Sequence, residues 1–236
     1  MTTIELRRSP STTALRTPVS AIAGTNTALD QPARVALVAA VAAVPPITIL
    51  HLSATGAVDP VSWTISDYVV TLPYGVPLFA MTTGALALGA GVLARGLGRL
   101  AGTRTVRTLL AIWASAVLAL AIFPTNLRGT PETISSNIHL VAGAVVFAVL
   151  PIAGLALARW HRSTLGRNPM TVVLTAISIV SGVLSTALIL NRLPGVIGMP
   201  ELMLPPGILQ RVAGAVEIAV LAVAAMTMLS AARRTR

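Results

Sequence analysis

Six apolar blocks, each near the length of a membrane-spanning helix, constrain this chain more than any other feature of its sequence. A helix needs about 20 consecutive apolar residues to cross the hydrocarbon layer of a bilayer, and backbone groups in lipid must be satisfied within the segment. The alternating pattern of β-barrel strands is missing from these blocks. We therefore expect an all-α polytopic membrane protein, a bundle of six transmembrane helices. The blocks span residues 35–54, 70–94, 106–125, 135–158, 170–190 and 209–231.

The composition supports lipid rather than water as the solvent around these blocks. Charged residues make up 10% of the 236-residue chain, whereas a soluble domain carries about 25%. So few charges do not cover a water-facing surface. The chain has no cysteine, which excludes disulfides, thiolate metal sites and a cysteine nucleophile.

The placement of arginine predicts the orientation of the bundle. All 17 basic residues are arginine, and 14 of them fall in gaps or ends on one side of the six blocks. Because basic residues accumulate in cytoplasmic loops, we expect both termini in the cytoplasm. The 14 are Arg7, Arg8, Arg16, Arg34, Arg95, Arg99, Arg104, Arg107, Arg159, Arg162, Arg167, Arg233, Arg234 and Arg236; the other side has Arg128, Arg192 and Arg211.

The same pattern predicts the partners, the location and the domains. Short arginine groups between apolar blocks are typical of contact with anionic lipid headgroups, and they do not form the basic face of a nucleic-acid-binding protein. We expect a multi-pass protein of the bacterial inner (plasma) membrane. Residues 1–33 are polar and favour a disordered cytoplasmic tail, followed by the transmembrane domain 34–232 and a basic end 233–236. Cleavage near Ala57, as in a signal peptide, is the alternative.

Two helices carry sequence features with a structural meaning. Pro45–Pro46 should break or kink the first span, because each proline removes a backbone donor. In the fifth span, Ser178, Ser181, Gly182 and Ser185 recur at helical spacing. Such small residues either allow close helix packing or form a polar pathway.

Most of the unusual polarity lies toward the expected outer side. It comes from the first outer loop, the end of the third span and the starts of the fourth and sixth spans. Polar groups at these places predict an outward-facing polar pocket. The candidate ligand-binding residues are Ser66, Asp67, Tyr68, Asn126, Arg128, His139, Arg211 and Glu217.

Asp67, His139 and Glu217 are also the candidates for catalysis. Glu217 shares one helix face with Gln210, Ala213 and Gly214, which should point inward. A carboxyl group at that depth is costly, so it serves either as a ligand or proton site or as a structural group paired within the bundle. His139 is either an acid–base group or a helix-start histidine bonded to a backbone carbonyl.

The sequence lacks the motifs that usually accompany two more specific kinds of site, a metal site and a serine hydrolase triad. His51, His139 and Asp67 would make a two-histidine, one-carboxylate metal set, but no HxxxH or HExxH pair is present. Ser66, His139 and Asp67 would make a hydrolase triad, but no GxSxG elbow is present. Ser66 and Asp67 also suit a helix cap or turn. We therefore expect no metal and no cofactor, and we interpret His161, next to Trp160, as interfacial.

Short motifs resemble those of a bacterial and archaeal membrane family called domain of unknown function 998. They are DP at Asp59–Pro60, ISDY at Ile65–Tyr68, FPT at Phe123–Thr125 and IH at Ile138–His139. The resemblance covers about residues 35–230 and implies a polytopic membrane fold. The family typically reads FPTD where this chain has Asn126, so one candidate carboxylate is missing.

The leading hypothesis for function is binding or passage of a small molecule or lipid headgroup at the outer pocket. The alternatives are a membrane-embedded enzyme acting on a lipid or isoprenoid-like substrate, with His139 and Asp67 or Glu217, and an accessory or scaffold subunit. A transporter needs a route to both faces, whereas an enzyme needs a site closed on one side. Convergence of the outer polar residues on one cavity would separate these hypotheses from the scaffold.

Overall fold

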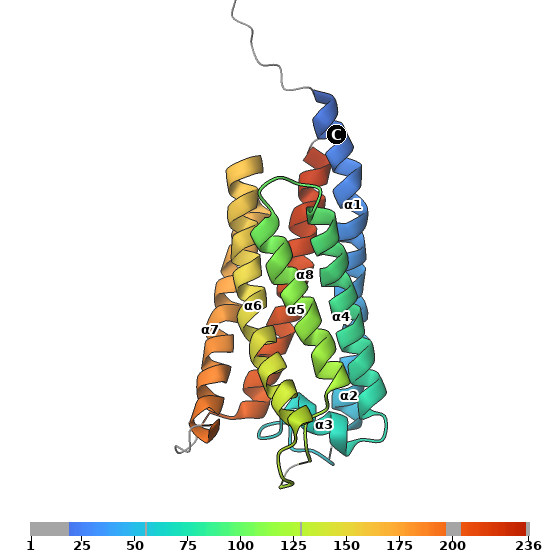
Figure 1. Cartoon of the computed structure of the whole chain (residues 1–236), viewed down its shortest axis with the longest axis vertical. Helices are drawn as coiled ribbons and strands as arrows, with labels where there is room; N and C mark the ends of the chain where they lie inside the picture. Colours follow the sequence, from blue (N-terminus) through green and yellow to red (C-terminus); the bar gives the residue numbers. More distant parts are fainter. Residues whose placement is uncertain (1–18, 55, 128, 197–203, 235–236) are drawn as a thin grey trace, which may run out of the picture.

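The computed structural model of the chain describes residues 19–54, 56–127, 129–196 and 204–234, with side chains described within 29–191 and 204–231. These residues form helices and no strands. The helices stand side by side with their axes roughly parallel (Figure 1). In chain order they are α1 (Val19–Ala42), α2 (Val44–Ser53), α3 (Ile65–Thr71), α4 (Gly75–Leu97), α5 (Arg104–Ile122), α6 (Ile134–Leu165), α7 (Pro169–Val196) and α8 (Pro206–Arg234).

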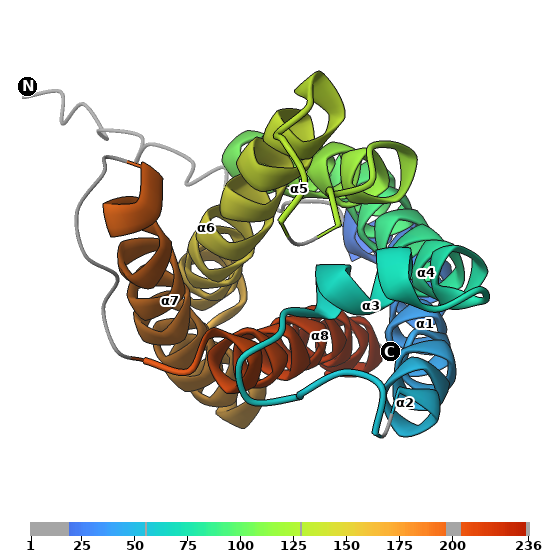
Figure 2. The same ribbon diagram turned by 90° about the horizontal axis from the view of Figure 1, so that it is seen from below.

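Six segments within the described residues are long and apolar enough to cross a membrane, which confirms the expected all-α polytopic bundle. α1 and α2 together form the first of them, and the short α3 forms none. The principal helix contacts run in a closed ring, α1–α4–α5–α6–α7–α8 and back to α1 (Figure 2). α8 also contacts α6 across the ring, and it is the most buried of the six spans. The last helix therefore packs mainly against three other spans, α1, α6 and α7. The six spans are Leu29–Ser53, Gly75–Leu97, Arg104–Ile122, Ile134–Leu165, Pro169–Asn191 and Pro206–Ala231.

The first span is broken where Pro45–Pro46 predicts a break. α1 ends at Ala42 and α2 begins at Val44, with the two prolines in the first turn of α2. Proline is tolerated in the first turn of a helix, where its missing N–H has no intrahelical partner to lose.

The structure differs from the sequence-based boundaries at two places. α1 begins at Val19, so residues 19–33 are helical where the sequence predicts a disordered tail; residues 1–18 lie outside the described residues. This stretch is rich in alanine, the best helix former, which extends the helix beyond the apolar block. The second predicted block, 70–94, is divided between α3 and α4, because Pro73 follows the end of α3 and does not continue a helix.

Small residues allow neighbouring helices to pack closely together. A methyl group added to Gly89 of α4 would come within 2.9 Å of the Ala39 methyl group on α1. A side chain at Gly154 of α6 would collide with the Ser178 hydroxyl of α7. Close approach of this kind is how helices gain dispersion energy in lipid, where no hydrophobic force drives them together. The serine row of α7 is buried against neighbouring helices (Ser178, Ser181 and Ser185), as expected for a packing surface.

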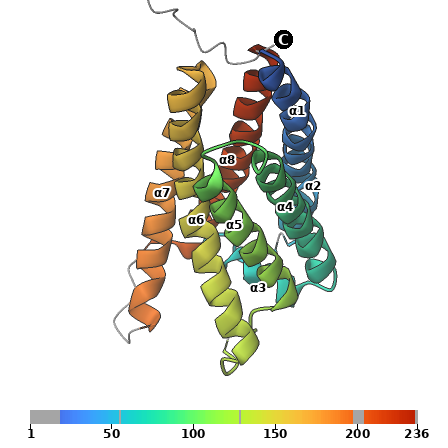
Figure 3. The same ribbon diagram turned by 45° about the horizontal axis from the view of Figure 1, so that its top comes forward.

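The two ends of the bundle differ in character. The α4–α5 turn, the end of α6 and the end of α8 lie at one end, together with the start of α1 (Figure 1). This end carries the arginine groups of the α4–α5 turn and of α6. The α2–α3 connection, the α5–α6 loop and the start of α8 gather at the opposite end, which we call the α3 end (Figure 3). The candidate polar residues lie in the segments of the α3 end, except for Glu217, which lies deeper in α8, and Arg128, which is outside the described residues.

Candidate functional site

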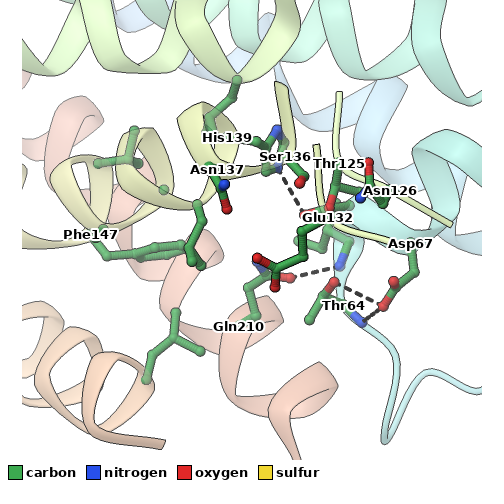
Figure 4. Close-up of a pocket in the computed structure, with 18 of the residues that line it drawn as sticks. Thr64, Asp67, Thr125, Asn126, Glu132, Ser136, Asn137, His139, Phe147 and Gln210 are labelled. Carbon is green, nitrogen blue, oxygen red and sulfur yellow. Dashed lines mark hydrogen bonds between the residues drawn. The ribbon is translucent and has the colours of Figure 1, made fainter. Parts of the chain in front are cut away.

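A cavity of about 580 Å³ opens at the α3 end of the bundle. Its walls come from α3, α5, α6, α7 and α8 and from the α5–α6 loop, with Phe79 of α4. Figure 4 shows polar side chains from the start of α3, the α5–α6 loop, α6 and α8 facing a common space. Volumes of 300–1,000 Å³ are usual for small-molecule sites, so this cavity has the size of a ligand site.

The cavity is polar near the loops and apolar toward the middle of the bundle. The polar lining comes from Thr64, Ser66, Asp67, Thr125, Asn126, Thr130, Glu132, Ser136, Asn137, His139 and Gln210, and the apolar lining includes Leu120, Leu140, Val146, Phe147, Leu188 and Ile189. Along α6 the lining extends from Ser136 to Phe147, or roughly 16 Å at 1.5 Å per residue. Below it, Leu150 and Ala153 are buried in the packed core. The lining along α6 therefore ends where this packed core begins.

The cavity also reaches the outer surface of the bundle. Leu140 lines it, yet 47% of this residue is exposed. Ala144, one turn further along α6, is likewise both a lining residue and exposed. Because this part of α6 lies within a membrane span, the cavity wall includes exposed residues at the depth of the apolar spans.

α3 is held in place by its own cap and by α8. The Asp67 carboxylate accepts hydrogen bonds from the Thr64 backbone N–H at 2.6 Å and the Thr64 hydroxyl at 2.9 Å, which completes a capping box. The Gln210 side-chain oxygen accepts from the Ile65 N–H at 2.7 Å. Asp67 lines the cavity, but this carboxylate oxygen is occupied by the cap. The arrangement follows the helix-cap interpretation of Ser66–Asp67.

His139 is fixed by two hydrogen bonds in the second turn of α6. Its Nδ1 lies 2.7 Å from the Phe123 carbonyl oxygen, and its Nε2 lies 3.2 Å from the Ser66 hydroxyl. A carbonyl oxygen only accepts, so Nδ1 carries the proton and Nε2 accepts from the serine. The ring is buried, and the Phe79 ring lies beside it with centroids 6.5 Å apart. The structure thus shows the bond to a backbone carbonyl that one interpretation of His139 predicts, and it places the Ser66 hydroxyl at the other ring nitrogen.

The side chain of Asn126 links the two ends of the α5–α6 loop by hydrogen bonds. Its Nδ2 donates to the Pro131 carbonyl, and its Oδ1 accepts from the Thr133 hydroxyl at 2.9 Å. Thr133 in turn caps α6 by accepting from the Ser136 N–H at 3.2 Å. Asn126 therefore shapes the polar rim of the cavity through hydrogen bonds within the loop.

The loop before α3 is ordered by Asp59 outside the cavity. The carboxylate accepts from the Ser62 hydroxyl and from the Val61 N–H. The Ser62 hydrogen bond, followed by the Val61 hydrogen bond, holds the pKa of Asp59 below its usual value. The DP motif thus acts as a turn.

Tyr68 and Arg211, predicted for ligand binding, lie outside the cavity lining. The Arg211 guanidinium is 4.7 Å from the Tyr68 ring centroid and donates to the carbonyls of Trp63 and Gly207. The His51 ring packs edge-on against Tyr68, with centroids 5.4 Å apart. These residues form a structural cluster that fastens the loop to α2 and α8. Arg128 lies outside the described residues.

Glu217 is buried in the bundle and does not line the cavity. It lies seven residues beyond Gln210, or about 10 Å deeper along α8. Its Oε1 accepts from the Ser181 hydroxyl of α7 at 2.6 Å, and no hydrogen-bond partner for Oε2 lies among the described residues. The predicted inward face of α8 is confirmed, since Ala213 and Glu217 are both buried. Glu217 is thus set apart from Asp67 and His139, which share the cavity.

The structure does not bring the proposed metal set together. Among the described residues, no group of three His, Cys, Asp or Glu side chains is placed to hold a metal. His51 bonds to the Ile47 carbonyl of its own helix, whereas His139 bonds to Phe123. His161, which we interpreted as interfacial, is 1% exposed within the bundle.

Sequence reasoning missed the parts of the site that are apolar or distant in sequence. Phe147, Leu188 and Ile189 form a cavity wall but carry the same apolar pattern as lipid-facing residues. Helical periodicity predicts that Gln210 lies on an inward face. It does not predict the hydrogen bond to Ile65, which joins residues 145 positions apart. No local pattern signals such a contact.

The fold defines the class of this protein, the multi-pass α-helical membrane proteins. Residues 37–227 match the model of the family described as protein of unknown function (DUF998), and the chain belongs to that family. The resemblance noted in the ISDY, FPT and IH motifs is thereby confirmed. No curated protein and no solved structure matches the chain.

Proposed function

We propose that the chain binds one amphipathic molecule in the cavity at the α3 end, which faces the outside of a bacterial plasma membrane. The polar group of the ligand lies against the rim formed by Asn126, Asn137, His139 and Gln210. Its hydrocarbon part lies against Phe147 and the neighbouring apolar wall. The observation that carries this proposal is the change of lining along a single cavity, from polar near the loops to apolar at depth.

Two further features support binding over passage or a purely structural role. The lining on α6 ends before the buried core residues Leu150 and Ala153, whereas a transport route needs access to both faces. Leu140 and Ala144 line the cavity and are also exposed at the depth of a membrane span, which is where a lateral entrance for a lipid molecule would lie. A scaffold would have no need of a lined cavity of about 580 Å³.

Filling the cavity tests the proposal. Gly143 lines it, and a Cβ atom there would have only the Leu120 Cδ2 atom within 4 Å, at 3.9 Å. Gly143→Leu therefore places a side chain in the cavity without a backbone clash. Gly214→Leu is the matched control, because it makes the same change in α8, away from the lining, at a site with nothing within 4 Å.

Native mass spectrometry of the purified protein, titrated with 1-monooleoylglycerol and with lysophosphatidylglycerol, gives the measurement. We expect one bound lipid per protein. Gly143→Leu should weaken binding at least about tenfold, equivalent to about 1.4 kcal/mol, while Gly214→Leu binds like the parent. A preference between the two lipids reports whether the headgroup is neutral or anionic. Equal binding by both variants, or no saturable adduct with either lipid, would rule the proposal out.

A further inference from the structure

Ser66 and His139 form a pair on the cavity wall that simple binding does not require. The Ser66 hydroxyl oxygen lies 3.2 Å from His139 Nε2, although the residues are 73 positions apart in the sequence. Ser66 is in the first turn of α3, His139 is near the start of α6, and both line the cavity. Within hydrogen-bond reach, an imidazole nitrogen can take the proton of a serine nucleophile.

The orientation of the imidazole fits the task of a base. Because Nδ1 lies 2.7 Å from the Phe123 carbonyl oxygen, this nitrogen donates and Nε2 presents its lone pair to the serine. The order hydroxyl, imidazole and acceptor is the order found in serine hydrolases, where the acceptor is usually a carboxylate. Here a backbone carbonyl takes that place. Asp67 does not, because its carboxylate caps α3 through Thr64.

Gln210 places a hydrogen-bond donor in the same cavity as the pair. Its side-chain oxygen is held by the N–H of Ile65, the residue before Ser66. This contact fixes which way the amide is turned, since a backbone N–H is accepted only by the oxygen. The NH₂ group of Gln210 remains as a hydrogen-bond donor, and Gln210 lines the cavity (Figure 4). A donor beside a nucleophile is what stabilises the negative oxygen that develops during acyl transfer.

We infer that Ser66 is the nucleophile and His139 the general base of an acyl-transfer site that acts on an ester of the amphipathic ligand. The inference rests on the proposed function, since the ester lies in the same cavity. The Ser66 oxygen attacks the ester carbonyl carbon, and its proton passes to His139 Nε2. The negative charge on the carbonyl oxygen accepts a hydrogen bond from the Gln210 NH₂ group.

The remaining steps restore the enzyme with water as co-reactant. The bond between the carbonyl carbon and the alcohol oxygen breaks, and the departing alcohol takes the proton from His139. Ser66 then carries the acyl group as an ester. A water molecule attacks this ester while His139 accepts its proton, and Ser66 recovers that proton as the carboxylic acid leaves. No electrons are transferred to or from an external group.

An alkyl fluorophosphonate probe tests the pair without knowledge of the natural ester. An activated serine displaces fluoride from phosphorus and stays covalently labelled, so the modified residue is found by peptide mass spectrometry on the full chain. We expect labelling at Ser66 and none in Ser66→Ala. His139→Gln should label at least about 100-fold more slowly, the lower range for a general base. Ser135→Ala is the matched control, since its hydroxyl bonds to the Pro124 carbonyl outside the lining.

The pH dependence of labelling and the lipid-binding assay distinguish failure of the acyl-transfer inference from failure of the proposed function. Labelling of the parent should rise with pH along a single ionisation curve, as His139 loses its added proton, and His139→Gln should remove this curve. Lipid binding without labelling of Ser66 would overturn acyl transfer and leave the proposed function standing. Labelling of Ser66 at an unchanged rate in His139→Gln would overturn the pairing. Labelling of Ser66 in a parent protein that binds neither lipid would overturn the proposed function and, with it, the amphipathic ester as the substrate. Gel filtration confirms that each variant is folded before it is scored.

Discussion

Removal of the Ser181–Glu217 hydrogen bond is the most direct test of how α7 and α8 are held together. The bond is 2.6 Å long and joins two buried side chains on different helices. Glu217→Leu leaves the Ser181 hydroxyl without this acceptor. Leaving a buried donor unsatisfied costs about 1–3 kcal/mol, whereas replacing both partners by apolar groups is nearly neutral.

These values predict the outcome of a double-mutant cycle. We expect Glu217→Leu to lower the free energy of unfolding by about 1–3 kcal/mol. Adding Ser181→Ala should recover most of that loss, so that the two changes are not additive. Glu217→Gln keeps a side-chain oxygen that accepts the same hydrogen bond, so this variant should be as stable as the parent.

Unfolding in mixed detergent micelles, followed by tryptophan fluorescence, measures all four proteins of the cycle. Trp113 of α5 is buried and lies close enough to interact with the Glu217 carboxyl group, so a reporter is already present. If the single changes add to within about 0.5 kcal/mol, the usual limit for independent sites, the hydrogen bond does not contribute as argued. Normal rescue of a deletion strain by Glu217→Gln would further show that the carboxyl group serves no proton transfer.

Three other features of the bundle give predictions of their own. A reporter fused in the loop between α2 and α3 should be outside the cell, and reporters in the α4–α5 turn and at the C-terminus should be in the cytoplasm; an external C-terminus would contradict the arginine argument. Gly154→Ala should lower the free energy of unfolding by about 1–3 kcal/mol through its collision with Ser178. Gly182→Ala is the control and should change little, because its methyl group would meet its nearest neighbour at an ordinary 3.7 Å. Equal losses of stability in the two variants would refute the close contact at Gly154. The lowered pKa of Asp59 means that its hydrogen bonds are present above pH 3.8 and are lost as the pH falls through the lowered value; NMR titration should place the pKa below 3.8, and Ser62→Ala should move it back toward that value.

The fold could be predicted from the sequence because lipid leaves few alternatives. Each apolar block must satisfy its backbone internally, so block length and the prolines at 45 and 46 determine spans and the break between α1 and α2. The boundary at Pro73 was missed because hydropathy alone does not separate a short interfacial helix from the span that follows. The inward face of α8 followed from helical periodicity.

The candidate site could be predicted only in part. The polar residues of the loops and helix starts stand out against an apolar chain, and Asp67 and His139 do share a cavity. Which polar groups are structural depends on partners that the sequence does not specify. Asp67 bonds to Thr64, while Glu217 pairs with Ser181 at a different depth. The Phe123 carbonyl that orients His139 is a backbone group, which no residue pattern reveals.

The attachment of α3 to α8 determines when the cavity forms during synthesis. The Ile65 N–H bonds to Gln210, and the Gly207 N–H donates to the Val61 carbonyl at 2.9 Å, so the loop and α3 depend on the final span. Ribosomes add about 5–20 residues per second, and 145 residues separate Ile65 from Gln210. The first two spans therefore wait roughly 7 to 30 seconds in the membrane before their last partner is made. A nascent chain that stalls before α8 is an anchored protein with an unfinished cavity, because the loop and α3 lack the partners that hold them.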